Sequence, residues 1–169
     1  MARGFTLLEM LIVVVVMGVL ATIAAPSFNT VIDKNRVFRV TSDIQHFLMN
    51  AKSEAVMRNT DLWVHFAKSS DDKWELSLRA NNTAVGYGNG QSGAIAYLDG
   101  NNYPSVTVSA SASTIRFEGI NGKPLESKNI KVNRGVNMLT KVMTHVGAGR
   151  IRVCEEAGRG YGYPNCPHL

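Results

Sequence analysis

Residues 1–26, MARGFTLLEMLIVVVVMGVLATIAAP, decide how the rest of the chain is interpreted. Between Phe5 and Ala25 the run carries one charged residue, Glu9. A bilayer core about 30 Å thick needs about 20 apolar helical residues, so residues 5–25 are long enough to cross it. Arg3 is the only charge ahead of the run. By the positive-inside rule, this predicts a cytoplasmic leader and places everything after Pro26 outside the membrane.

Glu9 is the unexpected residue of this run. An ionisable side chain inside a membrane segment is costly and usually marks a partner. The plain alternative is that Glu9, about one turn from the helix start, reaches the cytoplasmic interface. The pattern around it favours a partner.

The stretch Gly4-Phe5-Thr6-Leu7-Leu8-Glu9 resembles the processing site of type IV pilins and pseudopilins. The resemblance implies that a prepilin peptidase cuts after Gly4 and methylates the new amino terminus on Phe5. Glu9 becomes the fifth mature residue, which the family fills with Glu, and Pro26 falls where pilin helices commonly carry a proline. Both residues are therefore assigned to assembly. The implied fold is α+β and pilin-like, with a long N-terminal helix, its first half transmembrane, packed on antiparallel β-sheets.

This resemblance has a physical basis. An amino terminus on Phe5 is a cation with an unperturbed pKa of about 7.7–8. The Glu9 carboxylate can pair with it when subunits pack, and either charge buried alone would be costly. Glu9 is thus interpreted as an assembly device and not as a catalytic acid.

Hydrophobic periodicity predicts the remaining architecture. Apolar residues recur at spacings of three and four from Phe28 to Ala55, and Asn59-Thr60-Asp61 is the predicted helix stop. Pro26 is expected to kink or loosen this helix. Beyond it the period becomes two, which predicts a hairpin of Leu62–Phe66 with Trp74–Leu78 and further strands. The further strands are 94–98, 105–109, 114–118, 130–133, 138–145 and 150–154, with a turn at Asn121-Gly122.

These elements divide the chain into five predicted parts. They are a cleaved leader (1–4), a transmembrane and filament-core helix (5–25), an amphipathic helix (26–59), a β-sheet domain (60–153) and a C-terminal tail (154–169). Cys154 and Cys166 allow one intramolecular bridge in an oxidising compartment. It would close a loop of about 13 residues and contribute roughly 3 kcal/mol. Free or intermolecular thiols are the alternative.

Positive charge is concentrated at the C-terminal end. Residues 27–122 hold nine basic and nine acidic residues, whereas 123–169 hold eight basic and three acidic ones. A solvated basic face is the ordinary explanation. An anionic partner, nucleic acid first, is the functional one.

Two later stretches, Thr114–Gly119 and Gly149–Cys154, resemble the C-terminal half of minor pilins and pseudopilins of the GspH/FimT type. In FimT-like members a GRxR motif is implicated in DNA binding during natural transformation, and Gly149, Arg150 and Arg152 fill it here. In a strand both arginines share one face, with Ile151 toward the core. Gly149 would let the chain turn close to the ligand.

Other residues are expected to support this site. They are Lys141 and Arg159 as supporting cations, and Tyr161 or Tyr163 as a surface on which an unpaired base could stack.

Other site types find little support. Gly88-Asn-Gly-Gln-Ser-Gly93 matches a dinucleotide motif by letter, but it precedes a predicted strand instead of a helix, so we expect a flexible loop. The four histidines lack metal-ligand spacing. We therefore predict no enzyme activity, cofactor, metal or small-molecule substrate.

Three functions remain open. The chain is predicted to be a minor pilin of a type IV pilus, anchored in the bacterial inner membrane with a periplasmic domain and later extracellular. Its partners would be other pilin subunits, prepilin peptidase and DNA. The alternatives are a GspH-like pseudopilin of a type II secretion system, or a pilus-assembly subunit without DNA binding.

Overall fold

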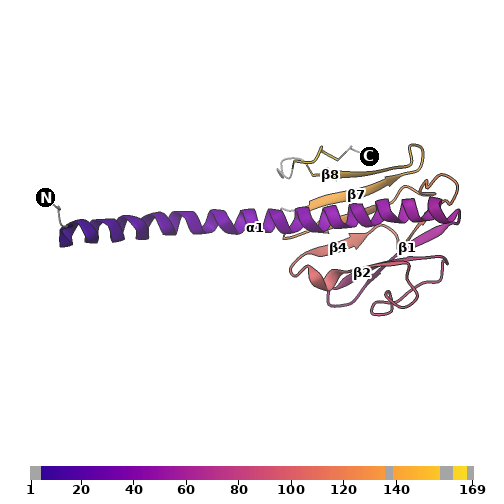
Figure 1. The fold of residues 1–169 in the computed structure, drawn as a ribbon, viewed down its shortest axis with the longest axis horizontal. Helices are drawn as coiled ribbons and strands as arrows, with labels where there is room; N and C mark the ends of the chain where they lie inside the picture. The colour runs from indigo at the N-terminus through magenta and orange to yellow at the C-terminus, as the bar shows by residue number, and fades with distance from the viewer. Residues whose placement is uncertain (1–4, 136–138, 157–161, 167–169) are drawn as a thin grey trace. The chain divides into compact units, whose positions relative to one another are not determined.

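The computed structural model describes residues 5–135, 139–156 and 162–166, with only the backbone for 23–28 (Figure 1). By internal contacts the chain forms two compact units, residues 1–35 and 36–169, and each is described by itself. The first holds the start of helix α1 (Leu7–Arg58), and the second holds its remainder and the strands that the structure describes.

Helix α1 has a defined start and stop. At its start the Glu9 backbone N–H donates to Thr6 Oγ1 at 3.3 Å, an N-terminal cap. At its end Asn59 takes a positive φ of 48°, the Asn59 N–H donates to the Val56 carbonyl and the Thr60 N–H to the Ala55 carbonyl. These two bonds around a left-handed residue form a Schellman motif, which confirms the predicted stop.

The first unit exposes those of its apolar side chains that the structure describes. Described residues from Phe5 to Thr22 are all exposed, including Leu7 at 85%. Within the described residues, we find no helix whose length and apolar character would suffice to cross a bilayer. The membrane assignment of 5–25 stays a prediction, as does the kink at Pro26, through which the helical assignment continues.

In the second unit, the described residues form eight strands in two antiparallel sheets. The first sheet has the order β3-β2-β1-β5 and the second β4-β6-β7-β8. The bounds are β1 Leu62–Lys68, β2 Trp74–Arg79, β3 Ala96–Asp99, β4 Thr107–Ala110, β5 Thr114–Phe117, β6 Asn129–Asn133, β7 Leu139–His145 and β8 Arg150–Glu155, with a short 3-10 helix, Gly100–Asn102.

The predicted strands are confirmed, with ends that differ by one or two residues. The β1–β2 hairpin is closed by the Ser69 N–H donating to the Lys73 carbonyl at 2.8 Å. The Asn121-Gly122 turn is present, with Gly122 at φ 65°. Met138, the first residue of one predicted strand, lies outside the described residues.

One core joins the second part of α1 to both sheets. Its fully buried members include Ile44 and Leu48 from the helix, Leu76 from the first sheet and Ile130 from the second. A buried hydroxyl pair crosses this core, with Thr41 Oγ1 and Thr140 Oγ1 2.6 Å apart. Thr41 donates to the Val37 carbonyl, so Thr140 supplies the proton between the two hydroxyls. The core fixes the inner face of the second sheet and so determines which side chains its outer face presents.

Candidate nucleic-acid interface

The β7–β8 hairpin carries the GRxR residues. Alternation along β8 places the two arginines on the outer face and the residue between them on the inner face. Arg150 and Arg152 are exposed, whereas Ile151 between them packs against the core and Val153 is buried. The prediction that both arginines share one face is therefore confirmed. Among the described residues, neither guanidinium has a hydrogen bond or an ion pair. Successive same-face residues lie about 6.6–6.8 Å apart along a strand, so two forks project side by side.

Gly149 provides the turn before β8 that the sequence suggested, and the closeness of this turn to a ligand stays a prediction. It is buried at a φ of 57°, and a Cβ there would lie 3.0 Å from Lys123 Cγ. Its carbonyl oxygen accepts a hydrogen bond from Lys52 Nζ at 2.8 Å. The glycine thus serves the left-handed turn that starts β8, and its backbone is held from α1.

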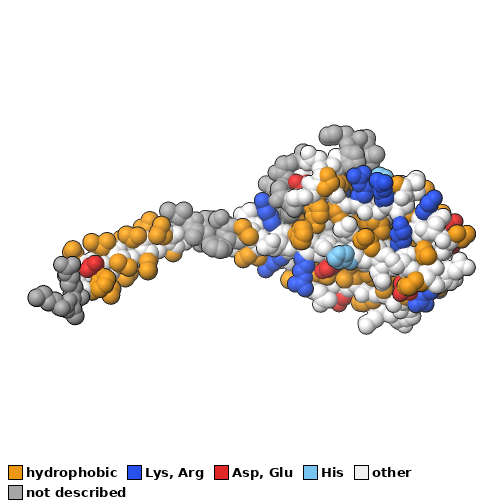
Figure 2. Space-filling view, turned by 45° about the horizontal axis from the view of Figure 1, so that its top comes forward, with side chains coloured by type: hydrophobic (Ala, Val, Ile, Leu, Met, Phe, Trp, Pro, Cys, Tyr) orange, Lys and Arg blue, Asp and Glu red, His pale blue; other side chains and the backbone are white. Residues whose placement is uncertain are grey.

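The strand register places more basic residues beside the arginines. His145 is opposite Arg150, and Lys141 of β7 is opposite Lys131 of β6. In Figure 2, Lys and Arg side chains gather near the upper margin of the folded domain, the region where Figure 1 places β7 and β8. We call this outer face, with Lys131, Lys141, His145, Arg150 and Arg152, the basic face.

The lysines of the basic face differ in whether a nearby carboxylate neutralises their charge. Lys141 Nζ lies 3.3 Å from Glu156 Oε1, and its side chain is 21% exposed, so its charge is partly neutralised locally. Lys131 is exposed and makes no hydrogen bond or ion pair with the described residues. Sequence reasoning did not single it out. The alternation of residues 130–133 predicts that the Lys131 side chain points away from the core. Only the strand register shows that it lies opposite Lys141. Arg159 lies outside the described residues.

A disulfide joins the tail to the edge of the basic face. Cys154 and Cys166 are bonded, with Cα atoms 4.8 Å apart, as predicted. The Glu155 N–H donates to the Pro164 carbonyl at 3.0 Å, and the Cys166 N–H to the Glu155 carbonyl at 2.9 Å. The tail segment 162–166 is therefore laid alongside the end of β8.

One face of the Tyr163 ring is covered by a contact within the protein, and its role as a base-stacking surface stays a prediction. Its ring stacks on Phe38 of α1 with a centroid distance of 5.6 Å and an interplanar angle of 14°. Burial in this contact raises the pKa of its hydroxyl. Tyr161, the other candidate, lies outside the described residues.

The other stretch that resembles GspH/FimT chains, 114–119, lies in the first sheet, away from the basic face. Arg116 of β5 bonds the Asp61 carboxylate, and its guanidinium stands 5.5 Å from the Trp63 ring centroid. The Arg116 hydrogen bond and then the Gly119 N–H hold the pKa of Asp61 below its ordinary value. This arginine has a local partner and fixes the start of β1.

The glycine-rich stretch 88–93 is a tightly held loop. Glu75, 2% exposed, accepts hydrogen bonds from the Gly90 N–H at 2.9 Å, the Gly88 N–H at 3.2 Å and the Tyr97 hydroxyl at 3.0 Å. Arg79 donates to the carbonyls of Asn89 and Gly90. The loop leads into β3 as predicted, and hydrogen bonds with Glu75 and Arg79 hold its backbone, whereas its flexibility stays a prediction.

The N-terminal site residues are placed only in part. Gly4 lies outside the described residues, and Phe5 and Glu9 are exposed. Within the described residues, no group of three or more His, Cys, Asp and Glu side chains could hold a metal ion. Pro26 is described by its backbone alone.

A long N-terminal helix packed on two antiparallel sheets, with a disulfide-held C-terminal segment, defines a pilin-like subunit. Family models agree at both ends of the chain. Residues 1–25 match the prokaryotic N-terminal methylation motif, and residues 40–162 match the type II transport protein GspH. The chain therefore belongs to the GspH family of type IV minor pilins and pseudopilins.

Known proteins resemble the chain in fold and in sequence. The crystal structure of the type IV minor pilin FimU of Pseudomonas aeruginosa superposes with a TM-score of 0.57 at 17% identity, covering 72% of this chain and 90% of FimU, and it supports the fold. A Pseudomonas aeruginosa fimbrial protein is 29% identical over 89 residues, 53% of this chain and 56% of the relative. The type IV major fimbrial protein FimA of Dichelobacter nodosus is 46% identical over 41 residues, 24% of this chain and 26% of FimA. The chain thus spans about half, or less, of the curated relatives it matches.

Proposed function

We propose that this chain is a minor subunit of a type IV pilus and that its basic face binds extracellular DNA for uptake. The observation that carries the proposal is the pair Arg150 and Arg152, two exposed guanidinium groups on one face without an ion pair among the described residues. Guanidinium forks match phosphate geometry. An anion that binds here would meet charges that no carboxylate among the described residues has already neutralised.

The DNA contact is expected to depend little on sequence. Arginines that face phosphates recognise charge and position, whereas base edges in the grooves carry sequence information. Lys131 on the same face would add a further phosphate contact. Lys141 would contribute less, because Glu156 lies 3.3 Å from its Nζ. Arg159 remains a proposed supporting cation.

Replacement of both arginines tests the proposal. The full chain, kept in solution by a non-ionic detergent, is titrated with fluorescent DNA at several salt concentrations. The double variant Arg150→Gln/Arg152→Gln should lower affinity for every DNA sequence and flatten the salt dependence by up to about two log–log units on duplex DNA. Arg116→Gln is the matched control, since its guanidinium bonds Asp61. Equal affinities of the wild type and the double variant, both correctly folded, would exclude the site.

Membrane anchoring and filament assembly are proposed from the N-terminal methylation motif. Prepilin peptidase would cut after Gly4, Phe5 would become the methylated amino terminus, and residues 5–25 would sit in the inner membrane and later in the filament core. Glu9 would pair with the amino terminus of Phe5. The second unit would be periplasmic before assembly and extracellular after it. Family membership implies a structural subunit, and the absence of enzyme activity stays a prediction.

One observation favours a second candidate function. The family model that covers residues 40–162 is described as a type II transport protein. The chain would then be a minor pseudopilin of a secretion system. Co-purification separates the two candidates, because a pilus subunit should be recovered with sheared pili, and a pseudopilin with a secretion complex of the envelope.

A further inference from the structure

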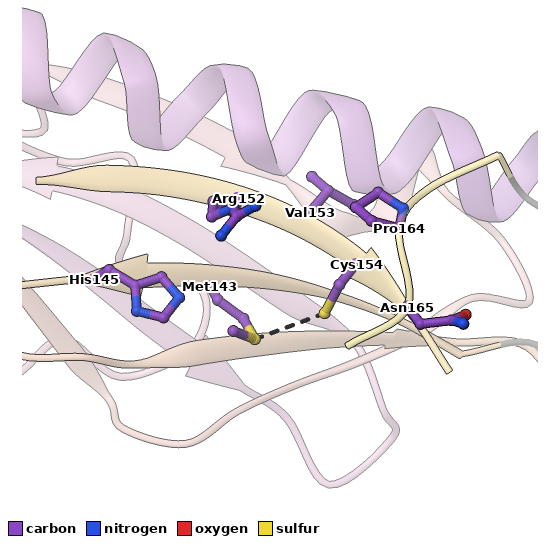
Figure 3. Close-up of a pocket in the computed structure, with 7 residues that line it drawn as sticks. All are labelled: Met143, His145, Arg152, Val153, Cys154, Pro164 and Asn165. Atoms are coloured by element: carbon purple, nitrogen blue, oxygen red, sulfur yellow. Dashed lines mark hydrogen bonds between the residues drawn. The ribbon is translucent and has the colours of Figure 1, made fainter. Parts of the chain in front are cut away.

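A small cavity opens on the basic face beside Arg152. It encloses about 190 Å³. It is lined by Met143, His145, Arg152, Val153, Cys154, Pro164 and Asn165 (Figure 3). Pockets that enclose a drug-sized ligand usually measure about 300–1,000 Å³. This cavity is therefore of a size for one ring-sized group and not for a whole ligand.

The floor of the cavity is apolar and rich in sulfur. Met143 is 9% exposed and Cys154 is 4% exposed. Met143 Sδ and Cys154 Sγ are 3.6 Å apart, the contact that Figure 3 marks with a dashed line. Cys154 is in a disulfide and its sulfur has no proton to donate, so this is a packing contact. Polarizable sulfur atoms make favourable contacts with aromatic rings, whereas they offer a phosphate no donor.

Two polar side chains stand above this floor from neighbouring strands. Met143 is directly opposite Arg152, and His145 is opposite Arg150, so His145 lies diagonally across from Arg152. Figure 3 shows the imidazole beside Met143 and the guanidinium above Met143 in the view, and the register puts both side chains on the same face of the hairpin. Neither His145 ring nitrogen is hydrogen-bonded to another described residue. The cavity therefore combines a flat aromatic wall, an apolar floor and a cation at its rim.

We propose that this cavity receives one unstacked nucleobase of single-stranded DNA, with His145 stacked on the base while Arg150 and Arg152 hold the adjoining phosphates. The inference rests on the proposed function and adds a preference among DNA forms. Unpaired bases are commonly stacked on aromatic side chains, His included. A base inside a duplex must first be unpaired and unstacked, which costs free energy. The basic face should then bind a single strand more tightly than a duplex.

Base-free DNA separates stacking from charge. The full chain in non-ionic detergent is titrated by fluorescence anisotropy with three probes of equal length: an oligothymidine strand, a mixed-sequence duplex, and a strand of abasic deoxyribose phosphates. The abasic strand keeps the phosphate charges and lacks every base. We expect it to bind about five-fold or more weakly than oligothymidine, the range that loss of one base–aromatic contact predicts.

Variants of His145 assign the effect to the cavity. His145→Ala should bind oligothymidine and the abasic strand equally, whereas His145→Phe should keep the difference because it keeps the aromatic face. His46→Ala, an exposed histidine of α1 outside the cavity, is the control and should behave as wild type. Equal binding of the two strands by the wild type, or an unchanged ratio in a folded His145→Ala variant, would overturn the base site and leave the phosphate contacts intact. Failure of the wild type to bind any probe would overturn the proposed function itself.

Discussion

Lys52 Nζ of helix α1 donates to the carbonyl oxygen of Gly149 at 2.8 Å. This hydrogen bond joins the helix to the turn from which β8 starts. Gly149 takes a left-handed φ of 57° there, and Lys123 packs over it. The turn from which the strand of Arg150 and Arg152 starts is therefore held by a helix residue, a loop residue and one backbone conformation.

Substitution of Gly149 should impair the basic face without changing its charge. A left-handed conformation costs an L-residue roughly 1–2 kcal/mol, so Gly149→Ala should lower the free energy of unfolding by about that amount. The Lys123 side chain must also shift, and DNA affinity should fall. Gly135→Ala is the matched control, because Gly135 has φ 66° and no atom within 4 Å of its Cβ position. It should lose similar stability and keep wild-type DNA binding in the same titrations. Identical DNA affinities of the two variants would mean that the turn does not position the arginines.

Loss of the disulfide should release the tail. Cys166→Ala leaves Cys154 as a buried thiol and opens a loop of about 13 residues, for which the chain-entropy model predicts a loss of roughly 3 kcal/mol. Urea unfolding with and without a reductant measures it. The wild type should be destabilised by the reductant and the variant should be indifferent to it. Unfolding midpoints that coincide in all four conditions would show that the bridge contributes nothing to stability.

Local sequence signals were sufficient for most of the fold. Alternation in Leu62–Phe66 and in Arg150–Arg152 gives each strand its inner and outer face, because side chains on a strand point to opposite sides in turn. Asn59 tolerates the left-handed conformation that ends α1. The methylation signature at Gly4–Glu9 identifies the class of protein. These features depend on residues within a few positions of each other.

The neighbours of the site residues could not be predicted in the same way. That His145 lies opposite Arg150, or Lys131 opposite Lys141, follows from strand register, which a one-residue slip would change. The Lys52–Gly149 bond and the Phe38–Tyr163 stack join distant parts of the chain. Such contacts are decided by the packing of the whole domain. For the same reason, the sequence did not show that Glu75 and Arg79 would hold the backbone of the glycine-rich loop 88–93.

Processing should depend on Gly4. The Gly4-Phe5 junction followed by Glu9 predicts that Gly4→Glu leaves the precursor uncut, because the peptidase must accommodate the residue before the scissile bond. Mass spectrometry of protein from the expressing cell measures the mass of the N-terminal peptide. Wild-type protein should begin with a methylated Phe5 and the variant should retain residues 1–4. A mature terminus at Phe5 in the variant would refute the cleavage assignment.

Glu9 should matter for assembly and not for the helix. Its backbone N–H, not its carboxylate, makes the 3.3 Å contact with Thr6 Oγ1, so Glu9→Gln leaves the helix cap in place. The variant loses the charge that would pair with the Phe5 amino terminus, and its share in sheared pili should fall sharply. Thr6→Ala is the control that weakens the cap and keeps the charge. Wild-type amounts of Glu9→Gln in sheared pili would remove the assembly role.

The hydrogen bond between Tyr103 and Asp43 should make the free energy of unfolding fall as the pH rises in the alkaline range. The Tyr103 hydroxyl donates to Asp43 Oδ2 at 2.8 Å and its ring stacks on Trp74. Burial first, then the hydrogen bond to Asp43, raises the pKa of Tyr103 from 10.0 to about 12, although nearby Arg39 opposes the shift. A folded-state pKa above the unfolded value means that the hydroxyl stabilises the fold fully below pH 10.0 and loses that contribution as the pH rises through about 12.

Tyr103→Phe keeps the stacked ring and lacks the proton. Urea unfolding across this range should therefore show a wild-type advantage that shrinks as the pH rises. Comparison with the variant cancels the parallel titration of Tyr97, whose pKa is also raised to about 12. A difference in unfolding free energy that stays constant from pH 9 to about 12 would contradict the assignment.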